Sequence, residues 1–63
     1  MTDAFLRLPE VLSRTGLSRP TIYRKMGRGE FPRAVQLGAN SVAWRESDVQ
    51  AWMREPMTWS AAA

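Results

Sequence analysis

The sequence predicts a mainly helical domain with one small β-hairpin, arranged as a winged helix-turn-helix. Two segments with helical apolar spacing are joined by a short turn that contains glycine, which is typical of helix-turn-helix units. Two alternating runs around a Gly/Asn/Ser turn then indicate a hairpin, and a third helical segment follows it. With 63 residues the chain can hold one domain, which we expect over residues 1–56, followed by a flexible tail over residues 57–63.

The first helix is expected to begin at Pro9, because proline is favoured at the first helical position. Leu8, Val11 and Leu12 fall on one face at helical spacing. Gly16 ends the helix, as glycine often does just past the last helical residue.

The second helix is predicted over residues 18–26. Ser18 is a suitable N-cap, because its hydroxyl can accept a free backbone N–H of the first turn. Pro20 falls in that first turn, where a missing N–H costs nothing. Gly27 and Gly29 are expected to end the helix.

The hairpin is predicted over residues 34–45, with its turn at residues 38–41. Apolar side chains alternate in both runs, so that each strand has an apolar face, formed by Val35 with Leu37 and by Val42 with Trp44.

The last helix is expected to begin near Ser47, which forms a capping box with Gln50. Pro56 ends it. Its apolar stripe consists of Val49, Trp52 and Met53. We expect Trp44 and Trp52 to lie in the core, and Trp59 is placed to fold back onto it.

The residue composition argues against catalysis. There is no cysteine and no histidine, which excludes disulfides, Cys/His zinc sites and any triad with a histidine base. We therefore expect no enzymatic activity and no cofactor. The N-terminus has no long apolar run, so we expect no signal peptide or membrane span and a cytoplasmic location.

The positive charge is concentrated in one segment. The net charge is +3, and the five cations and one acid of residues 17–33 contribute +4, while the rest of the chain contributes −1. A localised basic stripe is typical of proteins that bind nucleic acid.

A helical wheel divides the second helix into two faces. Ile22 and Met26 share an apolar face that we expect to pack, with Leu17, on the first helix and the hairpin. The opposite side holds Pro20, Thr21, Arg24 and Arg28, with Lys25 beside them.

This polar face suits the major groove of double-stranded DNA, where the second helix of a helix-turn-helix meets base edges. Arginine can grip guanine with two hydrogen bonds, and a threonine methyl can contact thymine. Arg24 and Thr21 are therefore the expected base contacts. The expected phosphate contacts, which position the protein without reading sequence, are Arg19, Tyr23, Lys25 and Arg28.

Several other interpretations stay open at this point. The cations can form an ordinary solvated helix face, and Tyr23 can pack at the edge of the core instead of contacting phosphate. A basic face can also bind an acidic protein, which would make the chain a protein-interaction module that binds a recombinase or repressor. A phosphate loop at Gly27 and Gly29 is disfavoured, because no strand precedes it.

Four short motifs resemble the AlpA family of phage and prophage regulators. They are FLRLPEV at residues 5–11, TGLSRPTIYRK at residues 15–25, GEFPR at residues 29–33 and VAWRESDVQAW at residues 42–52. The resemblance implies a winged helix-turn-helix related to the MerR-like DNA-binding domain. It also implies a transcriptional regulator, or an excisionase that bends DNA and directs an integrase. The matching recognition positions are Ser18, Arg19, Thr21, Tyr23, Arg24 and Lys25.

The resemblance places the wing at residues 38–42, where one departure occurs. Family wings often carry Arg or Lys at the tip, whereas this tip has Ala39, Asn40 and Ser41. Neutral groups can donate hydrogen bonds to phosphate but release no counterions. We expect Asn40 and Ser41 to make such bonds, and Arg33 and Arg45 at the hairpin base to take over backbone contacts. The expected partners are double-stranded DNA, an integrase or RNA polymerase, and further copies as a homodimer or cooperative array.

Overall fold

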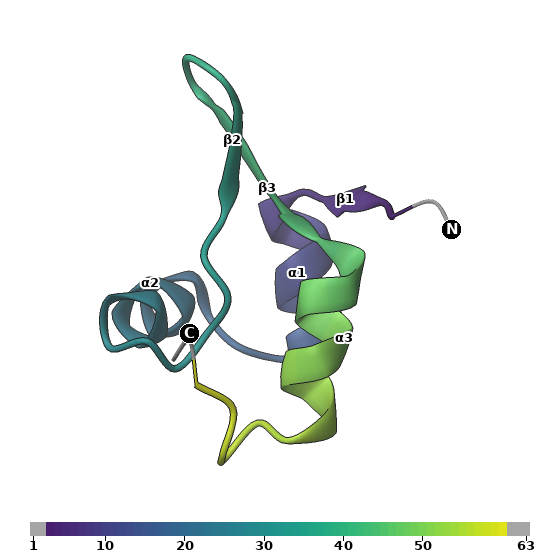
Figure 1. Cartoon of the computed structure of the whole chain (residues 1–63). Coiled ribbons are helices and arrows are strands. Elements are labelled where there is room, and N and C mark those ends of the chain that lie inside the picture. The colour runs from purple at the N-terminus through teal and green to yellow at the C-terminus, as the bar shows by residue number, and fades with distance from the viewer. Residues whose placement is uncertain (1–2, 61–63) are drawn as a thin grey trace.

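Three helices surround the base of a small β-hairpin in the computed structural model, which describes residues 3–60 (Figure 1). The elements follow the order β1 (Phe5–Leu6), α1 (Leu8–Thr15), α2 (Arg19–Gly27), β2 (Val35–Gly38), β3 (Ser41–Arg45) and α3 (Glu46–Arg54). This confirms the predicted mainly helical domain with one hairpin. Each predicted boundary lies within about two residues of the observed one, which is the usual uncertainty of helix ends.

The strands form an antiparallel sheet in the order β1-β3-β2. The hairpin turn contains only residues 39 and 40, so it is shorter than the predicted turn. A register shift between Gln36 and Gly38 marks an irregularity in β2 near the tip. The sequence analysis did not predict β1, whose residue Leu6 pairs with Trp44.

The three helices, β1, β3 and the connection after α2 contribute to one core. It consists of Leu6, Val11, Ile22, Phe31, Trp44, Val49 and Trp52. The predicted burial of Trp44 and Trp52 is therefore confirmed. The placement of Met53 in the apolar stripe of α3 was wrong, because this residue is 45% exposed. The buried stripe of this helix therefore consists of Val49 and Trp52.

Two tryptophans hold the connection between α2 and the hairpin. The indole N–H of Trp44 donates to the carbonyl oxygen of Pro32 at 2.9 Å, and that of Trp52 donates to the carbonyl oxygen of Glu30 at 2.9 Å. Between these two bonds, the Phe31 ring meets the Trp52 ring edge-on with centroids 5.1 Å apart. A buried tryptophan needs a partner for its N–H. Here that partner is the connection itself, so β3 and α3 fix where the hairpin leaves α2.

The first two helices have different kinds of ends. Gly16 ends α1 with a φ of 73°, a left-handed conformation that glycine adopts without strain. Ser18 is the N-cap residue of α2, but its hydroxyl makes no cap hydrogen bond and instead pairs with the Thr21 hydroxyl at 2.8 Å. The predicted capping bond was wrong. One of the two N–H groups that a cap can accept is missing, because Pro20 occupies that position.

The start of α3 is capped from the N-terminal end of the chain. The helix begins at Glu46, and the predicted capping box of Ser47 and Gln50 was wrong. One carboxylate oxygen of Asp3 accepts the Ser47 backbone N–H at 3.2 Å, and the other accepts its hydroxyl at 2.7 Å. The Glu46 N–H donates to the carbonyl of Ala4 at 2.7 Å. Pairing of β1 with β3 brings these groups together.

These contacts change the acidity of Asp3. The Ser47 hydroxyl, and then the Ser47 backbone N–H, hold the pKa of the Asp3 carboxyl below its ordinary value. Hydrogen bonds that favour the charged form have this effect. Asp3 therefore acts as an ionised cap that joins the chain's beginning to α3.

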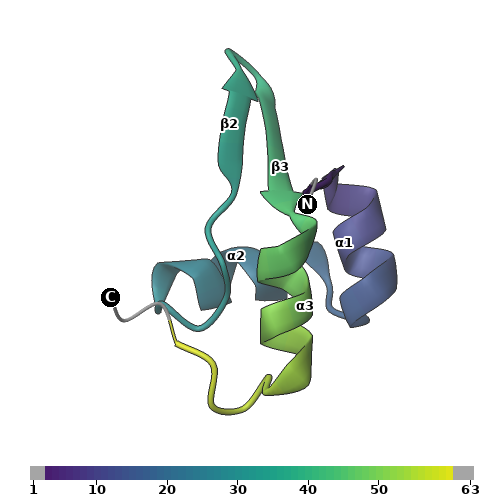
Figure 2. The ribbon, with the colours of Figure 1, turned by 45° about the vertical axis from the view of Figure 1, so that its right-hand side comes forward.

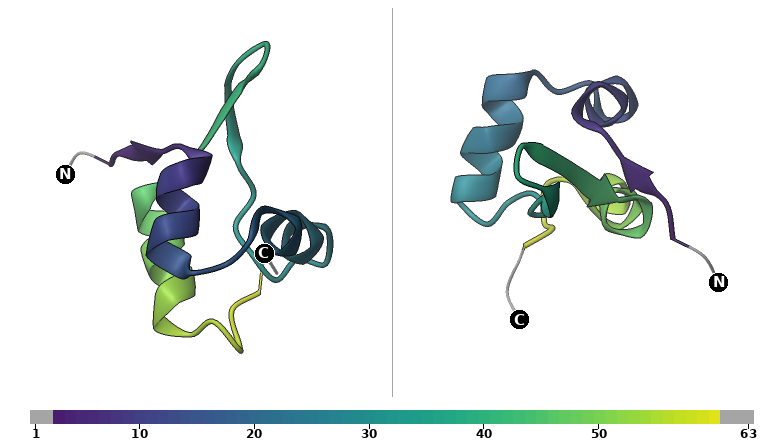
Figure 3. Two further views of the ribbon diagram at one scale, coloured as in Figure 1. Left: turned by 180° about the vertical axis from the view of Figure 1, so that it is seen from behind. Right: turned by 90° about the horizontal axis from the view of Figure 1, so that it is seen from above.

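The arrangement leaves α2 at one side of the molecule. Seen from above, α1 and α3 lie on one side and α2 on the other (Figure 3). The hairpin projects away from the helices on one side of α2, and the C-terminal segment (residues 56–60) passes on the other side (Figures 1 and 2). None of the helices in the described part of the chain is long and apolar enough to cross a membrane.

Candidate nucleic-acid interface

The inner face of α2 belongs to the core. Ile22 is fully buried, while Leu17 and Met26 are partly buried against the core cluster. This confirms the predicted apolar face. The remaining side chains of the helix are left at the surface, where the positive charge of the chain is concentrated.

The cations of α2 and of its C-cap residue, Arg28, have no acidic partner among the residues that the structure describes. Arg19, Arg24 and Arg28 are exposed and Lys25 is half-buried, and no ion pair within residues 3–60 includes any of them. The ion pairs found there all use Arg14 of α1. Its side chain therefore differs from those of the α2 arginines, which are available to a negatively charged partner.

Arg14 is held by two carboxylates. Its Nε lies 3.0 Å from Glu10 Oε2 and its Nη1 lies 2.9 Å from Glu46 Oε2. Glu10, followed by Glu46, raises the pKa of this guanidinium above its ordinary value through these hydrogen bonds. The pair with Glu46 joins α1 to α3, so this arginine stabilises the scaffold.

The N-terminal end of α2 presents small polar groups. Ser18, Arg19 and Pro20 are exposed, and Thr21 is half-buried. The hydrogen bond between the Ser18 and Thr21 hydroxyls fixes both side chains. No acidic residue lies in the first turn of this helix, so its positive end is not neutralised locally.

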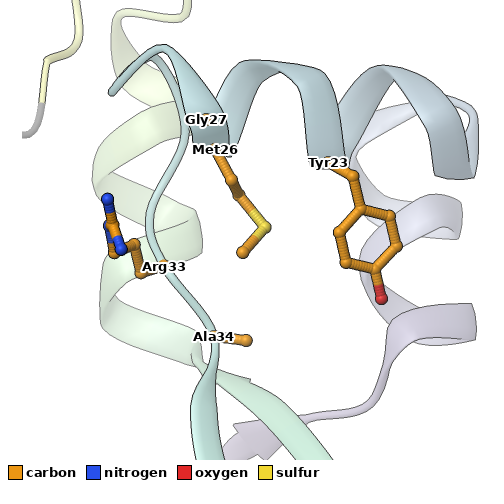
Figure 4. A pocket seen from close by; sticks show the side chains of 5 residues that line it. All are labelled: Tyr23, Met26, Gly27, Arg33 and Ala34. Carbon is orange, nitrogen blue, oxygen red and sulfur yellow. The ribbon is translucent and has the colours of Figure 1, made fainter.

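A pocket of about 330 Å³ lies on the hairpin side of α2. Its lining consists of Tyr23, Met26, Gly27, Arg33 and Ala34. The side chains of Tyr23 and Met26 extend from the helix toward the strand that follows Ala34, whereas Arg33 lies on the far side of the connection (Figure 4). The Tyr23 ring is 46% exposed, and its hydroxyl has no hydrogen-bond partner in the described residues. We call this the hairpin-side pocket.

A second depression lies on the opposite side of α2. It has a volume of about 460 Å³ and lies between the end of the helix and the C-terminal segment. Lys25, Arg28 and Glu30 line one wall, and residues 56–60 line the other. We call it the C-terminal groove. Of the predicted phosphate contacts, Tyr23 thus lies on one side of α2, and Lys25 and Arg28 lie on the other.

The hairpin presents no charge. Residues 34–44 include no charged side chain, and Leu37 and Val42 are 46% and 36% exposed. At the tip Asn40 is exposed and Ser41 is half-buried. The Gln36 amide donates to the carbonyl oxygens of Gly38 and Ala39 at 3.0 and 3.4 Å, which braces the turn.

The two arginines at the hairpin base lie in different surroundings. Arg33 borders the same pocket as Tyr23, so the structure brings it together with α2. Arg45 pairs with Phe5 of β1, and its charge contributes to lowering the pKa of Asp3. It therefore lies beside the scaffold elements and not beside the α2 cations.

Sequence reasoning overlooked the small residues of the site. Gly27 and Ala34 leave the space of the hairpin-side pocket open, and Met26 contributes its floor as well as core contacts. The signal in the sequence that could have indicated this pocket is the pair of small residues on either side of the connection, Gly27 and Ala34. In the described part of the chain, no three His, Cys, Asp or Glu side chains gather closely enough to hold a metal ion.

Comparison with known proteins adds an independent finding. A family model described as prophage CP4-57 regulatory protein (AlpA) matches residues 4–57. The chain belongs to the AlpA family. This confirms the resemblance inferred from the four motifs, and the match extends through all the helices and strands described above.

Two relatives extend this result. Uncharacterized protein ORF88 of Enterobacteria phage P4 is 55% identical over 51 residues, which cover 81% of this chain and 58% of ORF88. The chain therefore spans little more than half the length of that relative. The DNA-binding transcriptional activator AlpA of Escherichia coli (strain K12) is 36% identical over 56 residues, which cover 79% of this chain and 80% of the relative. No solved structure matches the chain.

Proposed function

We propose that this chain is a sequence-specific regulator that binds double-stranded DNA with α2 in the major groove. The observation that carries this proposal is the outer face of α2, where exposed cations have no acidic partner within residues 3–60. Unpaired cations gathered on one helix favour a polyanion. The name of the E. coli relative, a DNA-binding transcriptional activator, supports the same proposal.

In this proposal Arg24 is the main base contact. It lies opposite Ile22 on the helix, and therefore points away from the core. The major groove is roughly 12 Å wide and admits one helix, so the residue farthest from the core reaches the base edges. Arg24 would pair with guanine O6 and N7. The Thr21 methyl remains available to a thymine, because only its hydroxyl is used by Ser18.

The flanks of α2 would contact the two phosphate backbones that border the groove. Tyr23 serves the hairpin side, where its free hydroxyl can donate to phosphate, and Arg19 lies one helical turn before it on the same side. Lys25 and Arg28 serve the opposite side. Such contacts position the helix in the groove and carry no sequence information themselves.

The proposal also assigns a role in DNA binding to each part of the fold. α1 and α2 would form a helix-turn-helix of the MerR-like type, and the hairpin would be its wing. Because the wing tip is neutral, it would contact backbone or minor groove through Asn40 and Ser41. Arg33, at the edge of the hairpin-side pocket, would supply the charge. Arg45 pairs with β1 and does not line this pocket, so it would contribute less.

The cellular role follows from the kind of complex formed. We propose a regulator of a phage or mobile element, acting in the cytoplasm on the nucleoid and contacting RNA polymerase. An excisionase would use the same face of α2, but would also bind adjacent sites as an array and bend the duplex beside an integrase. Bending costs of the order of 1–6 kcal/mol, which several bound copies would have to offset. A bending assay on circularly permuted fragments distinguishes these two roles.

A binding experiment tests the proposal. Sites are selected from random duplexes and mapped by footprinting, and affinity is then measured for wild type, Arg24→Ala and Arg54→Ala. Arg54 is an exposed arginine of α3 and makes the control change in charge. We expect Arg24→Ala to weaken the selected site by about 1–3 kcal/mol and to relax sequence preference. If wild type binds no duplex even at low salt, the proposal is wrong, and a protein-interaction module that binds an acidic partner is favoured.

A further inference from the structure

The C-terminal segment is attached to the domain and lies beside α2. Trp59 is partly buried against the core cluster. The preceding turn is closed by the N–H groups of Thr58 and Trp59, which donate to the carbonyl of Glu55 at 3.2 and 2.8 Å. The Thr58 hydroxyl donates to the Glu55 carboxylate at 3.0 Å. These contacts direct the chain back toward α2 after α3 has ended.

The segment forms one wall of the C-terminal groove, and the other wall is positive. Lys25 and Arg28 line it with Glu30, which leaves one net positive charge. None of the three forms an ion pair with another described residue. The backbone of Glu30 is fixed, because its N–H donates to the Lys25 carbonyl and its carbonyl accepts the Trp52 indole N–H. The groove is therefore a fixed depression beside two unpaired cations.

Trp59 is not part of the family match. The matched region ends at residue 57, so this tryptophan and Ser60 lie beyond it. The contacts of Trp59 are therefore a feature of this chain that the shared family motifs do not account for. Its side chain lies on the side of α2 opposite to the hairpin-side pocket.

We propose that the C-terminal groove binds a phosphate group of the DNA backbone, and that Trp59 is the positioning residue that holds the wall of this site. The inference rests on the proposed function, since a helix in the major groove has a backbone on each side. The hairpin-side pocket faces one backbone and the C-terminal groove the other. Lys25 and Arg28 would bind the phosphate directly. Trp59 would act through these two cations. By packing on the core it would hold the C-terminal segment in place, and this segment would order the half-buried Lys25 side chain.

The test compares Trp59→Ala with Met53→Ala. Met53 is a 45% exposed residue of α3 that does not line the C-terminal groove, so its loss removes neither a core side chain nor a part of the site. Affinity is measured by fluorescence anisotropy on a selected and a random duplex between about 50 and 200 mM salt. We expect Trp59→Ala to weaken both duplexes by roughly three- to tenfold and to lower the salt slope by about 0.9, the loss of one phosphate contact. Met53→Ala should leave both quantities unchanged.

A double-variant background shows whether Trp59 acts through the cations. In Lys25→Gln/Arg28→Gln protein the phosphate contact is already lost, so adding Trp59→Ala should change neither affinity nor salt slope. An unchanged salt slope in folded Trp59→Ala, or an equal loss in the double-variant background, overturns the proposal. Thermal melting verifies folding. If Trp59→Ala is unfolded, Trp59→Leu retains apolar contact with the core but shortens the wall, and the same slope criterion applies to it.

The experiment separates this inference from the proposed function. If wild type binds no duplex, both are wrong. If wild type binds, and Arg24→Ala loses sequence preference while Trp59→Ala keeps the wild-type salt slope, only the groove proposal is wrong.

Discussion

α1 and α2 are built alike but differ in what their charges do. Each is a short helix with proline in its first turn, one fully buried side chain and basic residues in its last turn. In α1, Arg14 is paired with Glu10 one turn earlier and with Glu46 of α3. In α2 the position one turn before Arg24 is Pro20, which offers no charge. The position of carboxylates, and not helix geometry, therefore distinguishes the scaffold helix from the proposed DNA-binding helix.

The absence of acidic partners has a cost for α2. Arg24 and Arg28 are four residues apart, and like charges at this spacing destabilise a helix by about 0.2–0.5 kcal/mol. The first turn of α2 has no acid, whereas α1 and α3 have Glu10 and Glu46 there. Acids in the first turn stabilise a helix through its dipole. A bound phosphate backbone would supply α2 with the negative charge that the other two helices carry themselves.

The largest effect is expected from the fully buried side chains, because α1 and α2 each have one. Ile22→Ala removes the fully buried anchor of α2 and should destabilise the domain by about 2–5 kcal/mol. Small domains have only about 5 kcal/mol to lose, so much of the protein should be unfolded. Urea denaturation followed by circular dichroism measures this, with Leu37→Ala in the exposed hairpin as the control. If Ile22→Ala is as stable as the control, α2 is not anchored as described.

The second largest effect is expected from a variant that gives α2 the same intrahelical ion pair as α1. Pro20→Glu places a carboxylate four residues before Arg24, which is the spacing of Glu10 and Arg14. The new carboxylate should compete with DNA for Arg24 and also repel the phosphate backbone, so binding should weaken by about 1–3 kcal/mol. Thermal melting should show no loss of stability. Pro20→Gln is the uncharged control, and equal affinity of the two variants would contradict a role for the unpaired charge.

A smaller effect is expected from Lys25 at the flank of α2. Lys25→Ala should weaken selected and random duplexes alike and lower the salt slope by about 0.9, because one phosphate contact is lost. Sequence preference should not change. A salt titration measures both properties, with Arg14→Ala as the comparison from α1, since that arginine is held by carboxylates. A larger loss on the selected site than on random DNA would place Lys25 among the base contacts instead.

The apolar pattern was sufficient to predict the three helices, the hairpin and most of the core, because these depend on spacing within short segments. The capping of α2 and α3 was predicted wrongly for two different reasons. In α2, Pro20 lies within the first turn and removes a donor that the Ser18 hydroxyl could have accepted. In α3 the cap is Asp3, which lies far away in the sequence. β1 was missed for this second reason, because its partner strand is also distant in the sequence. Two residues form a strand only because β3 is already there to pair with them.

The candidate site shows the same limit. The wheel correctly separated Ile22 from the cations, because that division is a property of one helix. It could not show that Tyr23 faces the hairpin while Lys25 faces the C-terminal segment, since this depends on where two other elements lie. The burial of Trp44 and Trp52 was predicted, but not that their N–H groups hold the connection between α2 and the hairpin.

The smallest effect is expected from Asp3, the acid that caps the start of α3. The start of α2 has no such acid. Because hydrogen bonds from Ser47 hold the pKa of Asp3 below its ordinary value, the unfolded chain takes up this proton first on acidification. The contribution of Asp3 to stability is therefore complete above the ordinary pKa and is lost as the pH falls through the lowered one. Asp3→Asn should melt a few degrees below wild type at neutral pH, and the two melting curves should converge as the pH falls below the ordinary pKa of aspartate. Asp48→Asn, which removes a carboxylate of the same turn that makes no hydrogen bond within residues 3–60, is the control.

A constant difference between Asp3→Asn and wild type across this pH range would mean that the cap does not depend on the charge of Asp3. A difference that closes on acidification would show that α3 carries its own anion, as α1 does and α2 does not.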